Sequence, residues 1–202
     1  MNNFGGDFWD KKFSPKNFIY GTKPNIYFRE SLTKLNPGRI LMLGEGEGRN
    51  AIFAAIKNWK VDAIDFSRTA REKALNFARE NSVKINYTLS NLEDYIFVPN
   101  KYDAVGNIFL HLHPTIRKIV PPGIIFTLKK NGYLILEVFE KDQLGRTTGG
   151  PQNFDMLYSV EEIEKDFSSL KIISLEKKKI ILKEGDLHNG ETVVVKLFAQ
   201  KV

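Results

Sequence analysis

Glycine alternates with glutamate directly after a short apolar run, and this turn limits the possible folds more than any other sequence feature. The run is Arg39–Leu43 (RILML), and the turn continues through Asn50 (GEGEGRN). An unbroken apolar run is typical of a strand that is buried on both faces of a parallel sheet. Small apolar residues then recur at helical spacing over residues 49–59. The segment therefore predicts a strand, a bend that lets a ligand approach the backbone closely, and a helix.

The rest of the chain alternates between strand and helix patterns, which is typical of a layered α/β fold. The expected helices are 27–35, 49–59, one capped by Ser67, 114–130 split by Pro121-Pro122, and 159–167. The expected strands are 39–43, 61–65, 84–89, 102–109, 133–139, 170–182 and 192–201. The last two strands have no helical pattern between them, so they must pair antiparallel as a hairpin. We therefore predict an α/β, Rossmann-like three-layer sandwich whose seven-stranded, mostly parallel sheet ends in an antiparallel hairpin.

Length and composition exclude several classes of protein. A chain of 202 residues predicts one domain, with residues 1–25 as an irregular, aromatic N-terminal arm or lid. Because cysteine is absent, zinc–thiolate sites, iron–sulfur clusters and cysteine nucleophiles are excluded. No signal peptide and no bilayer-length apolar run is found, so we expect a cytoplasmic protein. The formal net charge of +6 is spread along the chain and favours acidic partners only weakly.

The spacing of the glycine turn argues against a bound pyrophosphate. Glycines at 44, 46 and 48 give G-x-G-x-G, which is neither the dinucleotide fingerprint nor the phosphate-binding loop of nucleotide triphosphatases. Glu45 and Glu47 lie inside the turn and would repel a phosphate group. The turn therefore suits a cofactor that carries positive charge near this loop.

Polar and aromatic residues follow the next two strands at the same edge of the predicted sheet. Asp65 ends the second strand, where a carboxylate can accept both hydroxyls of a ribose. Phe66 can cover an adenine face, and the turn after the third strand, residues 90–93, can reach an adenine edge. Asp65 as a mere helix cap is the alternative. Together these turns predict a nucleoside site at the carboxyl ends of the strands.

The ordered series of these motifs resembles class I S-adenosylmethionine-dependent methyltransferases, and more narrowly the tellurite-resistance and thiopurine methyltransferase-like group. The matching segments are FWD at 8–10, YGTKPN at 20–25, GEGEGRNA at 44–51, AIDFS at 63–67, NLED at 91–94, IFLHL at 108–112 and GGP at 149–151. Departures include Met42, Asn91, Pro121-Pro122 and Lys130-Asn131-Gly132.

The resemblance implies S-adenosyl-L-methionine as the cofactor and in-line methyl transfer to a small molecule. The acceptor it implies is a thiol, a thiopurine or a metalloid oxyanion. Glu45 is implied as the partner of the ammonium group of the cofactor, and Asp65 as the partner of its ribose. The residues expected to contact the cofactor are Tyr20, Gly44, Glu45, Gly46, Gly48, Arg49, Asn50, Asp65, Phe66, Ser67, Asn91, Leu92, Glu93, Asn107 and Phe109.

Candidates for the acceptor pocket are Trp9, His111, Arg146 and His188, although a surface role for Arg146 and His188 and plain packing for Trp9 stay open. No residue is assigned as catalytic, and the spacing of His111 and His113 supplies no third metal ligand. A nucleic-acid methyltransferase and a noncatalytic cofactor-binding module are the alternative functions. We expect a small-molecule partner rather than nucleic acid or a membrane, and a monomer or a homodimer.

Overall fold

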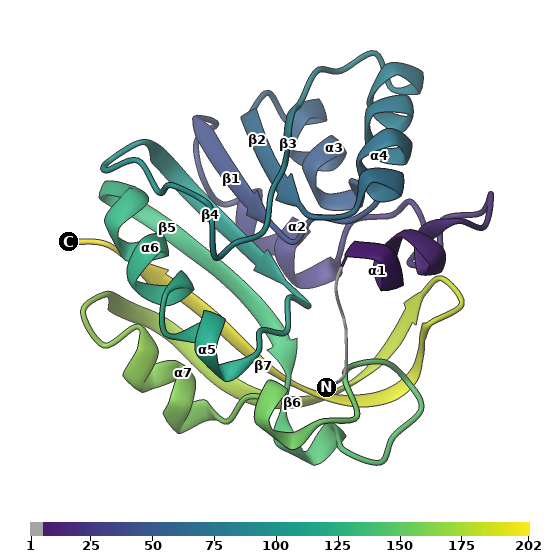
Figure 1. Ribbon diagram of the computed structural model, residues 1–202. Helices are drawn as coiled ribbons and strands as arrows, with labels where there is room; N and C mark the ends of the chain where they lie inside the picture. Colours follow the sequence, from purple (N-terminus) through teal and green to yellow (C-terminus); the bar gives the residue numbers. More distant parts are fainter. Residues whose placement is uncertain (1–5) are drawn as a thin grey trace.

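The computed structural model describes residues 6–202 and shows one seven-stranded sheet with the strand order β3-β2-β1-β4-β5-β7-β6 (Figure 1). Neighbouring strands from β3 to β5 pair in parallel, whereas β7 pairs antiparallel with both β5 and β6. The predicted α/β three-layer fold with a terminal hairpin is therefore confirmed. The strands are β1 Arg39–Leu43, β2 Lys60–Asp65, β3 Asn86–Leu89, β4 Tyr102–Ile108, β5 Leu128–Phe139, β6 Lys171–Glu184 and β7 His188–Gln200.

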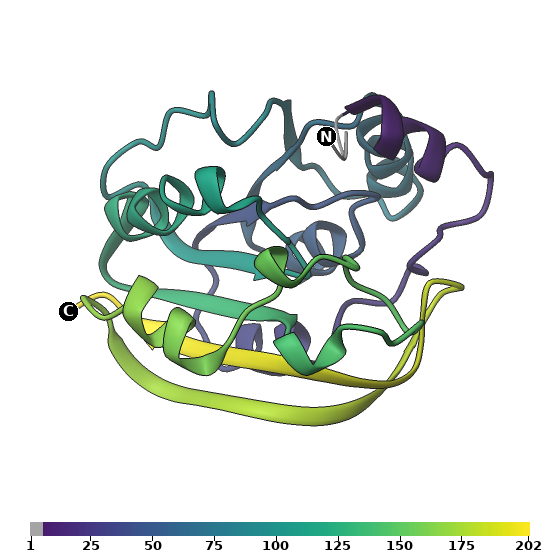
Figure 2. The same cartoon turned by 60° about the horizontal axis from the view of Figure 1, so that its bottom comes forward.

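Helices cover both faces of the sheet. They are α1 Gly6–Phe13, α2 Ile26–Leu32, α3 Arg49–Ile56, α4 Arg68–Glu80, α5 Pro114–Arg117, α6 Val120–Thr127 and α7 Val160–Asp166, with two short 3-10 turns at Lys141–Gln143 and Phe154–Met156. Figure 2 shows the sheet between its two helical layers. None of the helices described for residues 6–202 combines the length and the apolarity needed to span a bilayer.

Two apolar cores account for the two layers, because alternate residues of a strand point to opposite faces. Ile40 and Met42 of β1 pack with Phe28 of α2 and small residues of α3 and α4. Leu41 and Leu43 pack on the other face with α6 and α7. The unbroken apolar run of β1 is thus buried on both sides, as its sequence predicts.

The N-terminal arm differs from the sequence-based prediction. Residues 6–13 form the helix α1, which packs against α4 and buries Phe13. The helix was not predicted because it has only eight residues and a single fully buried side chain. Asp7 in its first turn and lysines in its last turn suit the helix dipole. Residues 1–5 of the predicted arm lie outside the described residues.

The predicted 114–130 helix is split in two, but the interruption does not lie at its two prolines. Pro121 and Pro122 lie in the first turn of α6, where the missing N–H groups have no intrahelical partner in any case. The interruption therefore comes before them, at residues 118–119, between α5 and α6.

The terminal hairpin is longer than expected and reaches the N-terminal arm. Only residues 185–187 separate β6 from β7. The Asp186 N–H donates to the carbonyl of Ile19 at 3.1 Å, and the Asn17 side chain donates to the Asp186 carboxylate at 3.0 Å. Figure 1 shows this tip beside the segment that follows α1. The segment after α1 and the tip of the hairpin thus meet at the carboxyl edge of the sheet.

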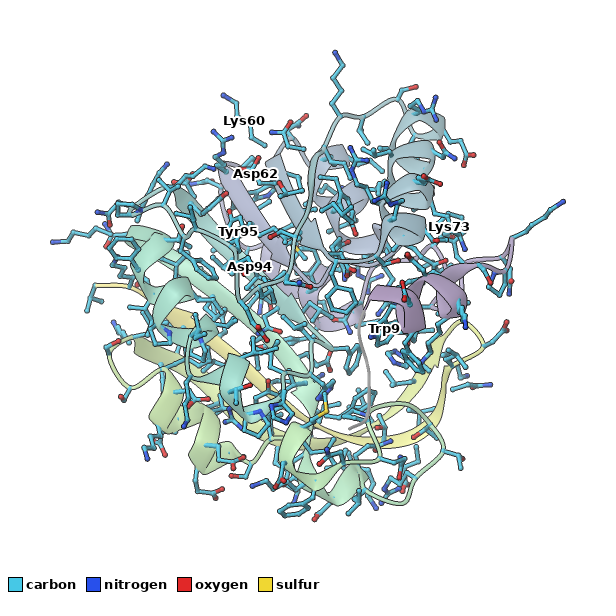
Figure 3. The ribbon with its side chains drawn as sticks, in the orientation of Figure 1. Trp9, Lys60, Asp62, Lys73, Asp94 and Tyr95 are labelled. Atoms are coloured by element: carbon cyan, nitrogen blue, oxygen red, sulfur yellow. The ribbon has the colours of Figure 1, made fainter. Side chains whose placement is uncertain are left out.

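A buried carboxylate, Asp62 on β2, joins strands in the opposite half of the sheet (Figure 3). It accepts hydrogen bonds from Arg39 at 3.0 Å, from Asn86 at 2.8 Å and from the Tyr102 hydroxyl at 2.8 Å. Burial alone would raise the pKa of Asp62, but these donors outweigh it and lower the pKa to about 2. The ionised carboxylate therefore stabilises the pairing of β1, β2 and β3.

Replacing Asp62 by Asn should lower the free energy of unfolding at pH 7 by about 1–3 kcal/mol, the usual size for hydrogen bonds to a charged group. Because the folded-state pKa lies below the ordinary one, the stabilisation is complete above about pH 4 and is lost as pH falls toward about 2. Urea unfolding at both ends of this range measures it. Asp94→Asn, at an exposed position, is the matched control. An equal deficit at both pH values would contradict the assignment.

Candidate functional site

The glycine turn between β1 and α3 is shaped by Glu45, which caps the helix rather than pointing away from it. One carboxylate oxygen of Glu45 accepts from the backbone N–H of Asn50 at 2.9 Å and of Ala51 at 2.7 Å. Burial raises the pKa of Glu45 to about 7, although these N–H groups and Arg49 favour the ionised form. The predicted ammonium partner is therefore also the N-terminal cap of α3.

The three glycines of the turn have different neighbours. A Cβ built on Gly48 would lie 2.6 Å from Ile52 and 2.8 Å from Ala74, so this glycine lets α3 pack against α4. A Cβ on Gly44 would lie 2.6 Å from the Leu110 side chain, and one on Gly46 would lie 3.2 Å from Phe13. Two apolar side chains thus pack directly against these glycines, Leu110 from the loop after β4 and Phe13 from α1.

Glu47, the second acid of the turn, anchors the arm. Its carboxylate forms an ion pair with Lys73 of α4 and accepts the Ile19 N–H at 2.9 Å. The Lys73 ammonium also donates to the carbonyls of Phe13, Pro15 and Asn17. Figure 3 shows Lys73 on α4, on the same side of the molecule as Trp9 of α1. Glu47 is therefore neutralised by the protein and not left for a cationic ligand.

Asp65 lies at the carboxyl end of β2 and faces the bend. Its two oxygens accept from the backbone N–H of Gly46 at 3.0 Å and of Ser67 at 2.8 Å. Burial raises the pKa of Asp65 to about 6, against the lowering effect of these N–H groups. Each carboxylate oxygen has a second lone pair, so the group retains acceptor capacity for hydroxyls.

Ser67 caps α4 and connects it to α1. Its hydroxyl accepts from the Ala70 N–H at 3.1 Å and donates to Asp10 at 2.6 Å. Asp10 also accepts from the Thr69 N–H at 3.0 Å, and the Ser67 hydroxyl is the main reason that the pKa of Asp10 is lowered. The predicted capping role of Ser67 is thus confirmed, and its hydroxyl is bound to the arm.

Only some of the residues expected beside an adenine lie together at the edge of the sheet near Asp65. Phe66 is half-buried next to Asp65, and the Ser90 N–H donates to the Asp65 carbonyl at 3.0 Å, which brings the turn after β3 to the same edge. Asn91 and Glu93 are exposed, whereas Leu92 belongs to the core of the α5–α7 face. Leu92 is therefore first of all a packing residue.

Asn107 carries an unusual buried oxygen. It lies on β4 directly beside Leu43 in the parallel register and is only 4% exposed. Its Oδ1 has no hydrogen-bond partner among residues 6–202, which is costly for a buried polar atom. Phe109, two residues on, adopts a left-handed conformation with φ of 55° and stacks on Phe139 at 4.6 Å. The backbone thus turns sharply just after β4, close to the unpaired Oδ1 of Asn107.

Arg49 and Asn50, at the start of α3, are occupied by other parts of the chain. The Arg49 guanidinium binds the Glu184 carboxylate at 2.8 Å and the Tyr20 carbonyl at 3.3 Å. The Asn50 side chain accepts the Asn25 N–H at 2.9 Å. Both residues therefore hold the arm and the hairpin onto the glycine turn.

The two histidines predicted for the acceptor pocket have different environments. Nδ1 of His111 lies 2.9 Å from the Met156 carbonyl, and its Nε2 accepts the Phe139 N–H at 3.3 Å. Burial lowers the pKa of His111 to about 4, so the ring is neutral and both nitrogens are bound to backbone. His188 is buried in contact with Tyr20, with ring centroids 4.4 Å apart. The predicted surface alternative for His188 is therefore wrong, because the hairpin turn buries this residue.

Arg146 and Trp9 are engaged in contacts outside the group formed by the glycine turn, Asp65 and Asn107. The Arg146 side chain is paired with Glu191 at 3.0 Å and donates to the Asp142 carbonyl, so we leave it out of the proposed pocket. Trp9 stacks on Phe13 at 5.4 Å and lies under the Lys12 ammonium. Its contacts are those of arm packing, the alternative that the sequence left open.

Five residues near this edge were not among the predicted site residues: Phe13, Asn25, Glu137, Phe139 and Glu184. Asn25 donates to Glu137 at 2.5 Å and to Glu184 at 3.2 Å, and Lys196 approaches Glu137 at 3.4 Å. A charged residue inside the apolar strand at 133–139 was the available signal for Glu137. The position of Glu184 depends on hairpin register, which no local pattern encodes.

The residues present fit a methionine-tailed nucleoside. Gly44 and Gly46 bend the backbone with positive φ, and Asp65 faces the same bend with spare acceptor capacity. The unpaired Oδ1 of Asn107 beside Leu43 suits a donor such as an ammonium group. Tyr20, with Phe13 6.4 Å away between ring centroids, forms the wall from the arm.

Comparisons with known proteins agree with this geometry. Residues 40–132 match the protein-family model described as a methyltransferase domain. The chain is 31% identical over 118 residues to the ubiquinone biosynthesis O-methyltransferase of Rickettsia akari (strain Hartford), covering 54% of this chain and 46% of that protein. The chain thus spans about half the length of this curated relative.

Solved structures share the fold at low sequence identity. TehB from Haemophilus influenzae superposes with a TM-score of 0.74 at 14% identity, over 98% of this chain and 67% of that one. The N-methyltransferase NodS from Bradyrhizobium japonicum WM9, in complex with S-adenosyl-L-homocysteine, gives 0.73 at 12% identity over 97% of each chain. These superpositions show a shared fold, and the match to the methyltransferase-domain model is confined to residues 40–132. The narrower tellurite-resistance and thiopurine group stays a prediction.

Replacing Lys73 by Met should loosen the arm without unfolding the sheet, because the ammonium binds Glu47 and three carbonyls of residues 13–17. Hydrogen exchange should show faster exchange of the Ile19 amide, which donates to Glu47, while amides of β1 and β4 stay protected. Lys34→Met, at an exposed lysine, is the control. Unchanged exchange over residues 13–20 would contradict the anchoring role.

Proposed function

We propose that this chain is an S-adenosylmethionine-dependent methyltransferase for a small-molecule acceptor, with residues 1–202 acting as one methyltransferase domain. The observation that carries the proposal is the meeting of the glycine bend, Asp65 and the unpaired Oδ1 of Asn107 at one edge of the sheet. This edge lies at the carboxyl ends of parallel strands, where open α/β sheets bind ligands. The family-model match over residues 40–132 includes all three features.

When bound, the cofactor supplies an electrophilic methyl group on a positively charged sulfur. The protein contributes position and charge. Asp65 holds the ribose hydroxyls, the turn at Gly44–Gly46 receives the methionine part, and Asn107 accepts from its ammonium group. Holding the reactants in line can supply about 7–11 kcal/mol of the barrier in favourable cases.

The walls of the site favour a small acceptor. Phe109, Phe139, Tyr20 and His188 form a continuous series of ring contacts with centroids 4.4–5.3 Å apart. The R. akari relative is described as an O-methyltransferase, and NodS as an N-methyltransferase. The sequence resemblance also implies thiols, thiopurines and metalloid oxyanions. A wall of aromatic rings suits a planar small molecule better than a nucleic-acid strand.

Isothermal calorimetry with S-adenosyl-L-homocysteine tests the proposal. We expect binding to the wild-type protein and about tenfold or weaker binding by Asp65→Ala, because a hydrogen bond to a charged group contributes about 1.5–3 kcal/mol. Asp94→Ala, at an exposed acid, should bind like the wild type. Thermal unfolding of each variant confirms that it is folded. The absence of binding by the wild type at millimolar ligand would refute the cofactor assignment.

A further inference from the structure

The turn of the terminal hairpin brings together two titratable side chains that the cofactor site does not use. Glu184 ends β6 and His188 begins β7, and the Glu184 carboxylate lies 3.4 Å from Nδ1 of His188. The side chains of His188 and Glu184 are 6% and 9% exposed. A histidine and a carboxylate that are both withdrawn from solvent form an oriented pair rather than a surface contact.

The carboxylate is fixed before it meets the imidazole. Arg49 binds one Glu184 oxygen at 2.8 Å, and Asn25 donates to the other at 3.2 Å. Glu184 thus accepts from Nδ1–H and selects the tautomer whose Nε2 carries a lone pair. Among residues 6–202, the side-chain hydrogen bond found for His188 is the one from Nδ1 to Glu184, and none is found for Nε2.

The ring of His188 is part of the aromatic wall beside the end of β4. Its centroid lies 4.4 Å from that of Tyr20, 4.7 Å from Phe109 and 5.3 Å from Phe139. Gly149 lies against the same ring, because a Cβ there would be 2.7 Å from Cδ2 of His188. Because these rings contact one another directly, a planar acceptor would approach Nε2 along the edge of the wall and not between the rings.

The other histidines in the described chain offer no comparable nitrogen. Both ring nitrogens of His111 are bound to backbone groups. His113 is exposed at the start of α5, with Nδ1 3.0 Å from the Thr115 hydroxyl. His188 is therefore the histidine whose geometry suits proton transfer.

We propose that His188, oriented by Glu184, is the general base for a hydroxyl acceptor on a planar ring, an inference that rests on the proposed methyltransferase function. The acceptor oxygen forms the bond to the methyl carbon while the carbon–sulfur bond breaks and its electron pair stays on sulfur. The hydroxyl proton goes to Nε2, and the resulting imidazolium then releases it to water. A thiolate or a metalloid anion needs no such base, so the pair points to a weakly acidic hydroxyl.

The charges around the ring agree with this role. Burial is the main reason that the pKa of His188 is lowered, the Arg49 and Lys12 cations lower it further, and Glu184 raises it. His111 and Tyr20 are the other titratable groups that face it. The ring is therefore neutral near pH 7 and able to accept a proton, and activity should fall as pH drops through this lowered pKa.

The test uses phenol, 4-nitrophenol, thiophenol and ethanethiol as acceptors, with S-adenosylmethionine as methyl donor. Wild-type protein should methylate phenol, and His188→Gln should lower kcat for phenol about 100-fold, the usual scale for general-base catalysis. The same variant should lose less than about threefold with 4-nitrophenol, which ionises without help. His113→Gln is the matched control and should match the wild type on both.

A second readout does not depend on turnover. Histidine ring shifts in NMR should show His188 as the neutral tautomer with the proton on Nδ1, and Glu184→Gln should lower its pKa because the stabilising charge is lost. Calorimetry with S-adenosyl-L-homocysteine should give the same affinity for His188→Gln as for wild type. Failure of wild type to bind this ligand would refute the proposed function instead of the base.

Three outcomes would overturn the assignment of the base. One is an equal loss of activity by His188→Gln on phenol and 4-nitrophenol, which would indicate a packing role. Another is methylation of the thiols alone, or of none of the four probes, by protein that binds S-adenosyl-L-homocysteine. The last is a His188 ring that carries its proton on Nε2.

Discussion

Withdrawing carboxylates from water is the constraint on which the carboxyl edge of this sheet depends. Glu45, Glu47, Asp65, Glu137 and Glu184 all lie there with little or moderate exposure. An isolated buried carboxylate is strongly unfavourable, so each needs donors that the fold must supply. Glu45 and Asp65 take theirs from backbone N–H groups, and Glu47 and Glu184 take theirs from Lys73 and Arg49.

These donors decide where the peripheral segments lie. Arg49 sits at the start of α3, so its ion pair with Glu184 fixes the hairpin tip over the glycine turn. Lys73 of α4 does the same for the arm through Glu47 and three carbonyls. Glu47 and Glu184 each need a cation to offset their burial, and the same contacts hold the arm and the hairpin tip in place. The charge balance of this edge and its shape therefore depend on the same residues.

The sequence predicted those parts whose cause is local. Arg39–Leu43 was identified by its unbroken apolar run, and Ser67 by its capping position. Asp65 could be placed because strand ends at one sheet edge are neighbours. The helix α1 was missed because its stability comes from Phe13 and Asp10 packing on α4, which is a tertiary effect. The position of Glu184 depends on the register of the hairpin, and the unpaired Oδ1 of Asn107 depends on the absence of a donor on the neighbouring strands. Patterns in a single sequence encode neither property.

The meeting of the hairpin tip with the arm has a consequence for how the chain is made. Asn17 and Asp186 are 169 residues apart in sequence, and Asn25 and Glu184 are 159 apart. During synthesis the amino-terminal segment leaves the ribosome long before its partners exist. The central strands can pair early, yet this edge of the sheet stays incomplete until residues 184–188 have been synthesised. Assembly of this region is therefore a late event, governed by the closure of a very long loop.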